Sequence, residues 1–191
     1  RSEEEDVYEP LFNNPISKDE IVAGIKHLKA GKSAGPDRIL GEMLKNANTV
    51  VIDFLVQLFN QLFETGTFPL EWAKSIIIPI HKKGDVNNPD NYHGISLTSA
   101  LSKVYTHILN KRLTKWAEIE EKIIEEQAGF RSKYSTIDHI FTLFSLVEKF
   151  LFCNSKLYVA FVDFKKAFDS VNRNALWDVL RKTGVNGKLY M

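Results

Sequence analysis

The amino-acid sequence predicts an α+β fold that is rich in helices. Three observations predict this class. Apolar residues recur at helical spacing over several long segments, two short apolar runs flank a turn-rich segment at residues 84–91, and a continuous apolar run covers residues 157–162. With 191 residues, 44% of them hydrophobic, the chain can bury the core of one domain, or of one domain and part of another.

Two helices are predicted in the first third of the chain. Ser17 and Glu20 have the spacing of a capping box, which starts a helix that continues to about residue 30. Its apolar face holds Ile21, Ile25 and Leu28. A loop, GlyLysSerAlaGlyPro, leads to a second helix over about residues 40–64, which Gly66 ends. The apolar stripe of this helix comprises Leu44, Val51, Leu55, Leu58 and Leu62.

A β-hairpin and two more helices are predicted next. A strand over residues 75–80 is joined to a strand that returns through residues 95–97 by the turn formers of residues 84–91. Helices follow over about residues 99–115 and 136–152. Their inward residues are expected to be Leu101, Val104, Tyr105, Ile108 and Leu109 in the first helix and Ile137, Ile140, Phe141, Phe144 and Val147 in the second. We interpret these stripes as core rather than as base-stacking platforms.

The apolar run at residues 157–162 predicts a strand covered on both faces, with Asp163 at its end. A carboxylate there either does chemistry at the rim of a sheet or caps the next turn, and the spacing alone favours neither. Asp169 is better explained as the entry to a helix over residues 173–182, which Gly184 stops.

Charge and composition exclude some classes of protein and leave others open. The formal net charge is only +1, but residues 72–115 carry seven lysines and arginines against Asp85 and Asp90. Such a stretch fits a phosphate backbone or a nucleotide triphosphate, and equally a solvated basic face. The single cysteine, Cys153, excludes a disulfide within the chain and is expected to be buried. No apolar stretch reaches the roughly 18 residues of a membrane span, so a soluble intracellular protein is expected, in nucleus or cytoplasm.

Six sequence blocks occur in an order that defines a resemblance. They are GlyLysSerAlaGlyProAsp at 31–37, PheProLeuGluTrp at 68–72, IleIleIleProIleHisLysLysGlyAsp at 76–85, AsnTyrHisGlyIleSerLeuThr at 91–98, GlnAlaGlyPheArg at 127–131 and ValAspPheLysLysAlaPheAsp at 162–169. In these blocks the chain resembles the reverse transcriptase domain of non-LTR (LINE-type) retrotransposons along almost its whole length.

The resemblance implies a right-hand polymerase fold that is truncated before the second pair of catalytic carboxylates. Residues 1–40 would be an N-terminal extension, residues 41–152 the fingers and residues 153–191 the first part of the palm. The implied activity is RNA-directed DNA polymerisation, a nucleotidyl transfer with two Mg²⁺ ions. The implied partners are an RNA template, a DNA primer and deoxynucleoside triphosphates.

The resemblance also assigns roles to residues around the nucleotide. Asp163 would ligate both metal ions, and the backbone carbonyl of Phe164 would complete one coordination shell. Phe168 would lie under the incoming sugar and exclude a 2′-hydroxyl, or else pack under the sheet. Lys82 would reach the triphosphate, although Lys83 could take its place because a shift of one residue at a strand end reverses the face.

His93 is the main departure from the family pattern, which has arginine after AsnTyr. Arginine keeps a permanent charge and a two-pronged donor, so we expect this copy to be impaired. The GlnAlaGlyPheArg block implies template contacts through Gln127, Gly129, Phe130 and Arg131, with Arg131 on a phosphate. Without the family resemblance, it is equally consistent with the sequence that Gly129 forms a turn and Phe130 packs in the core.

The family completes its catalytic centre with a hairpin that bears two adjacent aspartates, and no AspAsp pair occurs in this sequence. Both ends of the chain look cut, and the strand before Asp163 would need partners further downstream. We therefore expect the parent protein to be an RNA-directed DNA polymerase and the isolated chain to be inactive. The alternatives are a non-catalytic RNA-binding module and a decayed fragment of an element.

Overall fold

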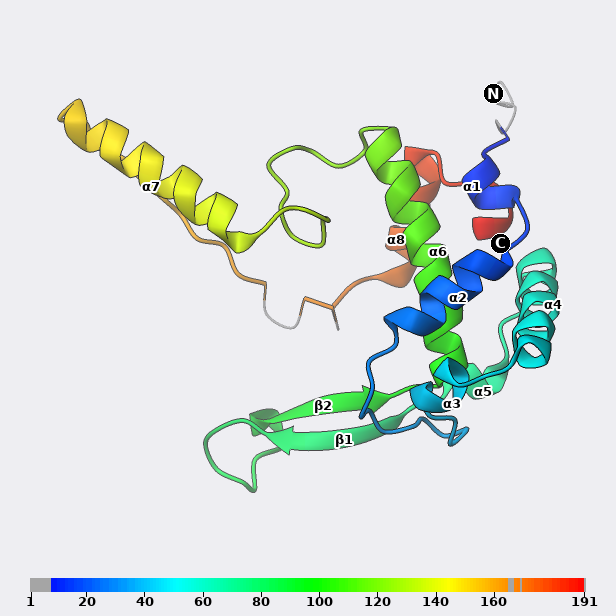
Figure 1. Ribbon diagram of the computed structural model, residues 1–191. Coiled ribbons are helices and arrows are strands. Elements are labelled where there is room, and N and C mark those ends of the chain that lie inside the picture. Colours follow the sequence, from blue (N-terminus) through cyan, green and yellow to red (C-terminus); the bar gives the residue numbers. More distant parts are fainter. Residues whose placement is uncertain (1–7, 165–166, 169, 191) are drawn as a thin grey trace. The chain divides into compact units, whose positions relative to one another are not determined.

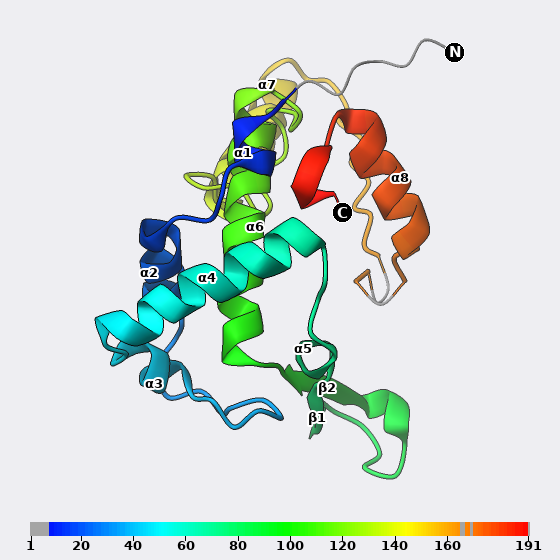
Figure 2. The same cartoon turned by 90° about the vertical axis from the view of Figure 1, so that its right-hand side faces the viewer.

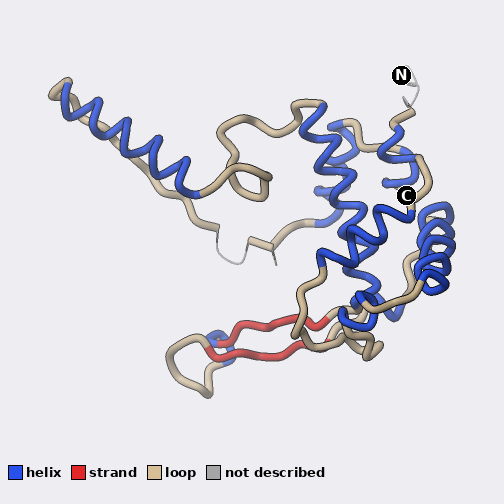
Figure 3. Tube along the Cα trace, viewed as in Figure 1, coloured by secondary structure: helices blue, strands red, loops and turns tan. Residues whose placement is uncertain are grey.

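A computed structural model describes residues 8–164, 167–168 and 170–190 of the chain. The described residues form two structural units. The first contains the residues up to Trp116 together with those from Gly184 onward, and the second contains Ala117–Thr183. In the part of the chain that is described, helices predominate and the sheet has two strands (Figure 3). The predicted α+β class, rich in helices, is therefore confirmed.

The first unit holds most of the regular structure (Figure 1). Its elements are α1 (Pro10–Asn13), α2 (Lys18–His27), α3 (Gly41–Lys45), α4 (Thr49–Thr65), α5 (Leu70–Ala73), β1 (Ile76–His81), η1 (Pro89–Asn91), β2 (Tyr92–Leu97), α6 (Ala100–Ile119) and η2 (Gly187–Leu189). Helix α6 continues by a few residues into the second unit, which also holds α7 (Thr136–Phe152) and α8 (Arg173–Thr183).

The core of the first unit lies where α2, α4 and α6 pack against one another. Phe59 of α4 is fully buried and meets Tyr105 of α6 edge to face, with ring centroids 5.3 Å apart. Gly24 brings α2 against α6, because a Cβ there would lie 3.0 Å from the side chain of Val104. Figure 2 shows α4 lying across α6. Trp72, from the PheProLeuGluTrp block, is also buried in this core and contacts Phe59.

A buried arginine fastens the N-terminal segment to α6. Arg112 binds Glu20 through two parallel bonds, Nε to Oε1 at 2.6 Å and Nη2 to Oε2 at 2.8 Å. It also donates to the carbonyl oxygens of Asn14 at 2.6 Å and Pro15 at 3.0 Å. Partial burial opposes ionisation of Glu20, but the bonds from Arg112 and Ser17 outweigh it and lower the Glu20 pKa. One carboxylate thus serves both the cap of α2 and the link to α6.

The helices predicted in the first third are largely confirmed. The capping box of Ser17 and Glu20 starts α2, and Gly66 ends α4 in the left-handed conformation with φ +63°. The second helix is nevertheless two helices, because Asn48 caps a new one by accepting the N–H of Val51. Val51 is 41% exposed, against the prediction. The residues of α4 that are buried are Ile52, Leu55, Phe59, Leu62 and Phe63.

The hairpin and the position of α6 are confirmed as well. Strands β1 and β2 pair antiparallel in a register that sets Ile78 opposite Ile95 and Ile80 opposite His93. Figure 1 shows the pair extending away from α2, α4 and α6 of the same unit. In α6, Val104, Tyr105 and Ile108 are buried as predicted, whereas Leu101 and Leu109 are partly buried.

In the second unit the predicted helices are present, but the predicted burial is wrong. Helix α7 has the predicted bounds, and Ser135 and Asp138 form its capping box. Its expected inward residues are exposed, from Ile137 at 71% to Val147 at 38%. Cys153, expected to be buried, is exposed too. Helical spacing shows that one face of a helix is apolar, and it does not show whether another element covers that face.

The strand predicted before Asp163 does not form. Residues 157–164 have no regular secondary structure, and Tyr158, Phe161 and Val162 are all at least 80% exposed. A strand needs a neighbour to satisfy its backbone N–H and C=O groups, and in the described part of the chain the two strands present pair only with each other. The helix that follows is confirmed as α8, and Gly184 after it adopts φ +109°.

Candidate functional site

The β1–β2 hairpin brings two of the predicted nucleotide-side residues together. His93 lies directly opposite Ile80, and the bond from the Lys82 N–H to the Asn91 carbonyl, at 2.8 Å, continues the ladder beyond β1. Side chains of a strand alternate between faces, so Lys82 is on the same face as Ile80 and His93, whereas Lys83 follows outside this pattern. Lys82, Lys83 and His93 are all exposed. The register therefore places His93 and Lys82 on the same face of the hairpin.

The tip of the hairpin is held by side-chain bonds to its own backbone. Asn91 donates to the carbonyl of Asp85 at 2.9 Å, and the hydroxyl of Tyr92 donates to the carbonyl of Val86 at 2.9 Å. Gly84 adopts φ +88°, and a Cβ there would lie 2.6 Å from the Asn91 amide. These bonds fix the turn directly beyond Lys82 and Lys83.

The hairpin is joined to the helical core where β2 ends. Ser99 is fully buried and accepts from the N–H groups of Leu101 at 3.1 Å and Ser102 at 3.3 Å, which caps α6. Gly35 lies directly against this junction, since a Cβ at Gly35 would be 2.6 Å from the carbonyl carbon of Thr98. Sequence reasoning treated the GlyLysSerAlaGlyPro loop only as a connection and missed this role. The glycine-proline pair in the block was the available signal.

The GlnAlaGlyPheArg block forms an ordered loop around Arg131. The guanidinium binds Glu118 through Nε at 3.0 Å and Nη2 at 2.8 Å, and Nη1 donates to the carbonyl of Ile124 at 3.0 Å. It also lies 4.2 Å from the ring centre of Tyr134. The bond from Arg131 lowers the pKa of Glu118, and the bond to Glu118 raises the pKa of Arg131. All three guanidinium nitrogens therefore have partners, two in Glu118 near the end of α6 and one in the loop.

The other predicted template-side residues lie at the surface of this loop. Phe130 is 93% exposed and adopts φ +63°, a conformation that costs a bulky side chain energy. Gly129 is exposed with open space around it, and the Gln127 amide donates to its carbonyl at 3.3 Å. The ring of Phe130 meets the ring of Phe168 edge to face, with centroids 6.2 Å apart. Phe130 is thus an exposed ring and is not part of the core.

Asp163 and Phe164 lie exposed in the irregular segment after α7. Phe168 is 81% exposed and has Phe130 as its ring neighbour. Asp169 lies outside the described residues. In the part of the chain that is described, no three histidine, cysteine or acidic side chains are grouped so that they could hold a metal ion. The structure thus places Lys82 and His93 on one face of the hairpin in the first unit and brings Phe130 into contact with Phe168 in the second.

Comparison with known proteins identifies the class to which this arrangement belongs. The family described as reverse transcriptase (RNA-dependent DNA polymerase) matches residues 80–191, more than half of the chain. The match covers the end of β1, the whole of β2 and the segment of Asp163. The chain belongs to the reverse transcriptase family.

Individual relatives are polymerases of transposable elements. The chain is 32% identical over 176 residues to the probable RNA-directed DNA polymerase from transposon BS of Drosophila melanogaster, which covers 88% of the chain and 19% of that relative. It is 30% identical over 165 residues to the probable RNA-directed DNA polymerase from transposon X-element of the same organism, and this match covers 82% of the chain and 17% of that relative. The polymerase of the mobile element jockey is 26% identical over 157 residues, with the same shares. The chain therefore spans less than a fifth of the length of these relatives.

Among the helices of the described residues, none combines the length and the apolar character needed to cross a membrane.

Proposed function

We propose that the chain is the fingers and the first part of the palm of a retrotransposon RNA-directed DNA polymerase. The observation that carries this proposal is the family match over residues 80–191, which contains both β2 and Asp163. Residues 1–40 would form an N-terminal extension, residues 41–152 the fingers and residues 153–191 the start of the palm. The substrates of the whole protein would be an RNA template, a DNA primer and deoxynucleoside triphosphates.

On this proposal, Lys82 and His93 face the triphosphate of the incoming nucleotide. The hairpin register supports Lys82 over Lys83, because Lys82 continues the face on which His93 lies. The exposure of both side chains leaves them free to contact a ligand. Phe168 would exclude a 2′-hydroxyl, and its exposed ring is compatible with a contact to the sugar.

Arg131 has a different role from the other three residues of its block. Gln127, Gly129 and Phe130 remain candidates for contacts with the template strand, because all three are exposed. The N–H groups of Arg131 are already bonded to Glu118 and to loop carbonyls. We therefore propose that Arg131 positions the loop that carries Gln127, Gly129 and Phe130. A direct bond from Arg131 to a phosphate would require loss of the pair with Glu118.

The described residues do not by themselves fit a site for two Mg²⁺ ions. Asp163 with the carbonyl of Phe164 offers too few oxygen ligands, and no group of three metal-binding side chains exists among the described residues. The sequence also lacks an AspAsp pair. We propose that residues outside these 191 supply the further carboxylates and that the isolated chain does not polymerise DNA.

The proposed contact of Lys82 with the triphosphate can be tested in the full-length protein. Lys82→Ala should raise the KM for deoxynucleoside triphosphates about tenfold or more, because a charged bond to the triphosphate is lost. The matched control is Lys83→Ala, which removes the same charge one residue away and should change the KM much less. Equal effects of the two variants would show that the hairpin does not present Lys82 to the nucleotide.

A non-catalytic RNA-binding module is the second candidate. It is favoured by one observation, which is that the described residues hold no complete set of metal ligands. Its signature would be salt-dependent RNA binding by the full-length protein with no synthesis of DNA in the presence of Mg²⁺. Primer extension on an RNA template would exclude it.

A further inference from the structure

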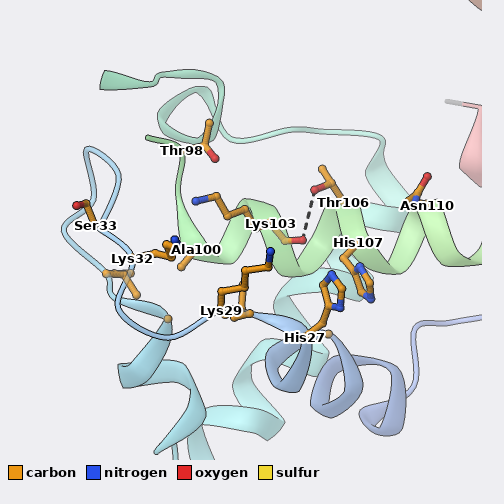
Figure 4. A pocket seen from close by; sticks show the side chains of 14 residues that line it. His27, Lys29, Lys32, Ser33, Thr98, Ala100, Lys103, Thr106, His107 and Asn110 are labelled. Carbon is orange, nitrogen blue, oxygen red and sulfur yellow. Dashed lines mark hydrogen bonds between the residues drawn. The ribbon is translucent and has the colours of Figure 1, made fainter. Parts of the chain in front are cut away.

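A cavity of about 540 Å³ lies in the first unit, between α2, the loop that follows it and the first half of α6 (Figure 4). Five of its lining side chains are basic, namely Lys29, Lys32, Lys103, His27 and His107. None of the residues that line it in the described part of the chain is acidic. This cavity belongs neither to the hairpin face of Lys82 and His93 nor to the Asp163 segment.

None of the three lysines forms an ion pair with a carboxylate of the described residues. Lys18, Lys74 and Lys188 form ion pairs with Asp53, Glu71 and Glu64, whereas none of the ion pairs among the described residues involves Lys29, Lys32 or Lys103. Figure 4 shows these three side chains in the space between the loop and the first turns of α6. Several like charges around one concave site attract an anion and raise its local concentration.

Two histidines, His27 and His107, line the other end of the cavity. His27 of α2 and His107 of α6 stack with ring centroids 4.1 Å apart and an angle of 15° between the planes. Burial lowers the pKa of His107, and the nearby His27 and Lys111 lower it further. The other charged groups that line the same cavity are Lys29 and Lys32 of the loop and Lys103 of α6, and Lys111 acts on His107 from the same helix; all four are cations. A bound anion would oppose this effect and favour protonation of His107.

The frame of the cavity is held independently of any ligand. Gly35 lies against Thr98 and Ser99 at the start of α6, and the Gly31 N–H donates to the carboxylate of Glu42. The carboxylate of Asp37 accepts the N–H of Ile39 at 3.2 Å. Both acidic groups of this region therefore bond to the backbone of the loop, and neither lines the cavity. The loop that carries Lys29 and Lys32 is fixed on the helix that carries Lys103.

We propose that this cavity binds a phosphate group, held by Lys29, Lys32 and Lys103, with the stacked pair of His27 and His107 supplying additional positive charge when the group is bound. The phosphate is carried either by a free polyphosphate or by a nucleic-acid strand, since both present the same chemistry to lysine and imidazolium. The proposal predicts that binding takes up protons and therefore strengthens as the pH falls.

The test uses the 191-residue chain and two probes, inorganic pyrophosphate and a short oligouridylate without terminal phosphates. Affinity is measured by calorimetry, and the imidazole signals of His27 and His107 are followed by NMR. The double variant Lys29→Ala/Lys103→Ala should weaken binding at least about tenfold, because two charged contacts are lost. The matched control is Lys26→Ala/Lys115→Ala, which removes two exposed lysines from α2 and α6 outside the cavity.

The pH arm uses oligouridylate, or sulfate if only pyrophosphate binds, because neither changes its charge between about pH 6 and pH 8. The wild-type chain should bind more tightly at about pH 6 than at about pH 8, because the bound anion favours the protonated form of His107, and His27→Gln/His107→Gln should remove this dependence. Binding of pyrophosphate alone would identify a free phosphate compound as the ligand, and binding of oligouridylate would identify a strand. Absence of binding by both probes, or equal losses in the control and cavity variants with unchanged NMR fingerprints, would overturn the proposal. None of these assays depends on polymerase activity.

Discussion

Replacement of Arg112 tests how the first unit is held together. Its side chain is only 7% exposed, and it makes two bonds to Glu20 and one each to the carbonyls of Asn14 and Pro15. Arg112→Met keeps an unbranched apolar side chain, but it removes all of these bonds and the guanidinium that lies over the ring of Phe63. It would leave three backbone carbonyls, those of Leu11, Asn14 and Pro15, and a partly buried carboxylate without this partner.

The expected cost follows from the burial of the pair. Loss of one partner from a buried ion pair costs about 3–5 kcal/mol, and Glu20 is 32% exposed, so we expect the lower half of this range, about 3–4 kcal/mol. The comparison variant is Lys18→Met, which breaks an ion pair with Asp53 whose side chains are 47% and 55% exposed. Such an exposed pair contributes only about 0–1 kcal/mol.

Urea denaturation measures both variants, with the fluorescence of Trp72 and Trp116 as the signal of the first unit. Both indoles are buried, and Trp116 packs on Phe12 with ring centroids 5.0 Å apart. The free energy of unfolding should fall much further for Arg112→Met than for Lys18→Met. If the two variants lose the same amount, the link through Arg112 is not what fastens the N-terminal segment to α6.

Three further predictions concern single residues. The pKa of Glu20 is lowered from its ordinary value of 4.5, so the stability that its ionised form contributes is present above that value and is lost as the pH falls through the lower pKa of the folded state. The stability of Glu20→Gln should therefore fall less steeply in acid than that of the wild-type chain. An identical acid transition in the two proteins would contradict this. In the full-length protein, Phe168→Ala should raise incorporation of ribonucleotides relative to deoxyribonucleotides in primer extension, and an unchanged ratio would exclude the steric role. In the same assay, His93→Arg should raise the rate of incorporation by as much as about 10²-fold, since it restores a charged two-pronged donor, and no gain would show that histidine suffices.

The local elements were predictable because their signals are local. The capping boxes at Ser17 and Ser135 and the turn formers at residues 84–91 act within a few residues, so the starts of α2 and α7 and the hairpin follow from the sequence. The break between α3 and α4 was missed because Asn48 caps a helix inside an otherwise continuous apolar pattern.

Burial could not be predicted in the same way, because it depends on what another element covers. The apolar faces of α7 and of residues 157–162 are real, but in the described residues both are exposed. The pair of Arg112 with Glu20 joins positions 92 residues apart, and nothing in the sequence around either one signals it. Likewise, the strand register was needed to show which of Lys82 and Lys83 shares a face with His93.

Primer extension on an RNA template by the full-length protein tests the central claim most directly. The variant Asp163→Asn is compared with Asp178→Asn, which changes an exposed aspartate of α8 in the same unit. We predict Mg²⁺-dependent DNA synthesis that Asp163→Asn reduces by more than about 10²-fold and Asp178→Asn leaves unchanged. Full activity of Asp163→Asn, or no synthesis by the wild-type protein, would contradict the assignment of this chain to a working RNA-directed DNA polymerase.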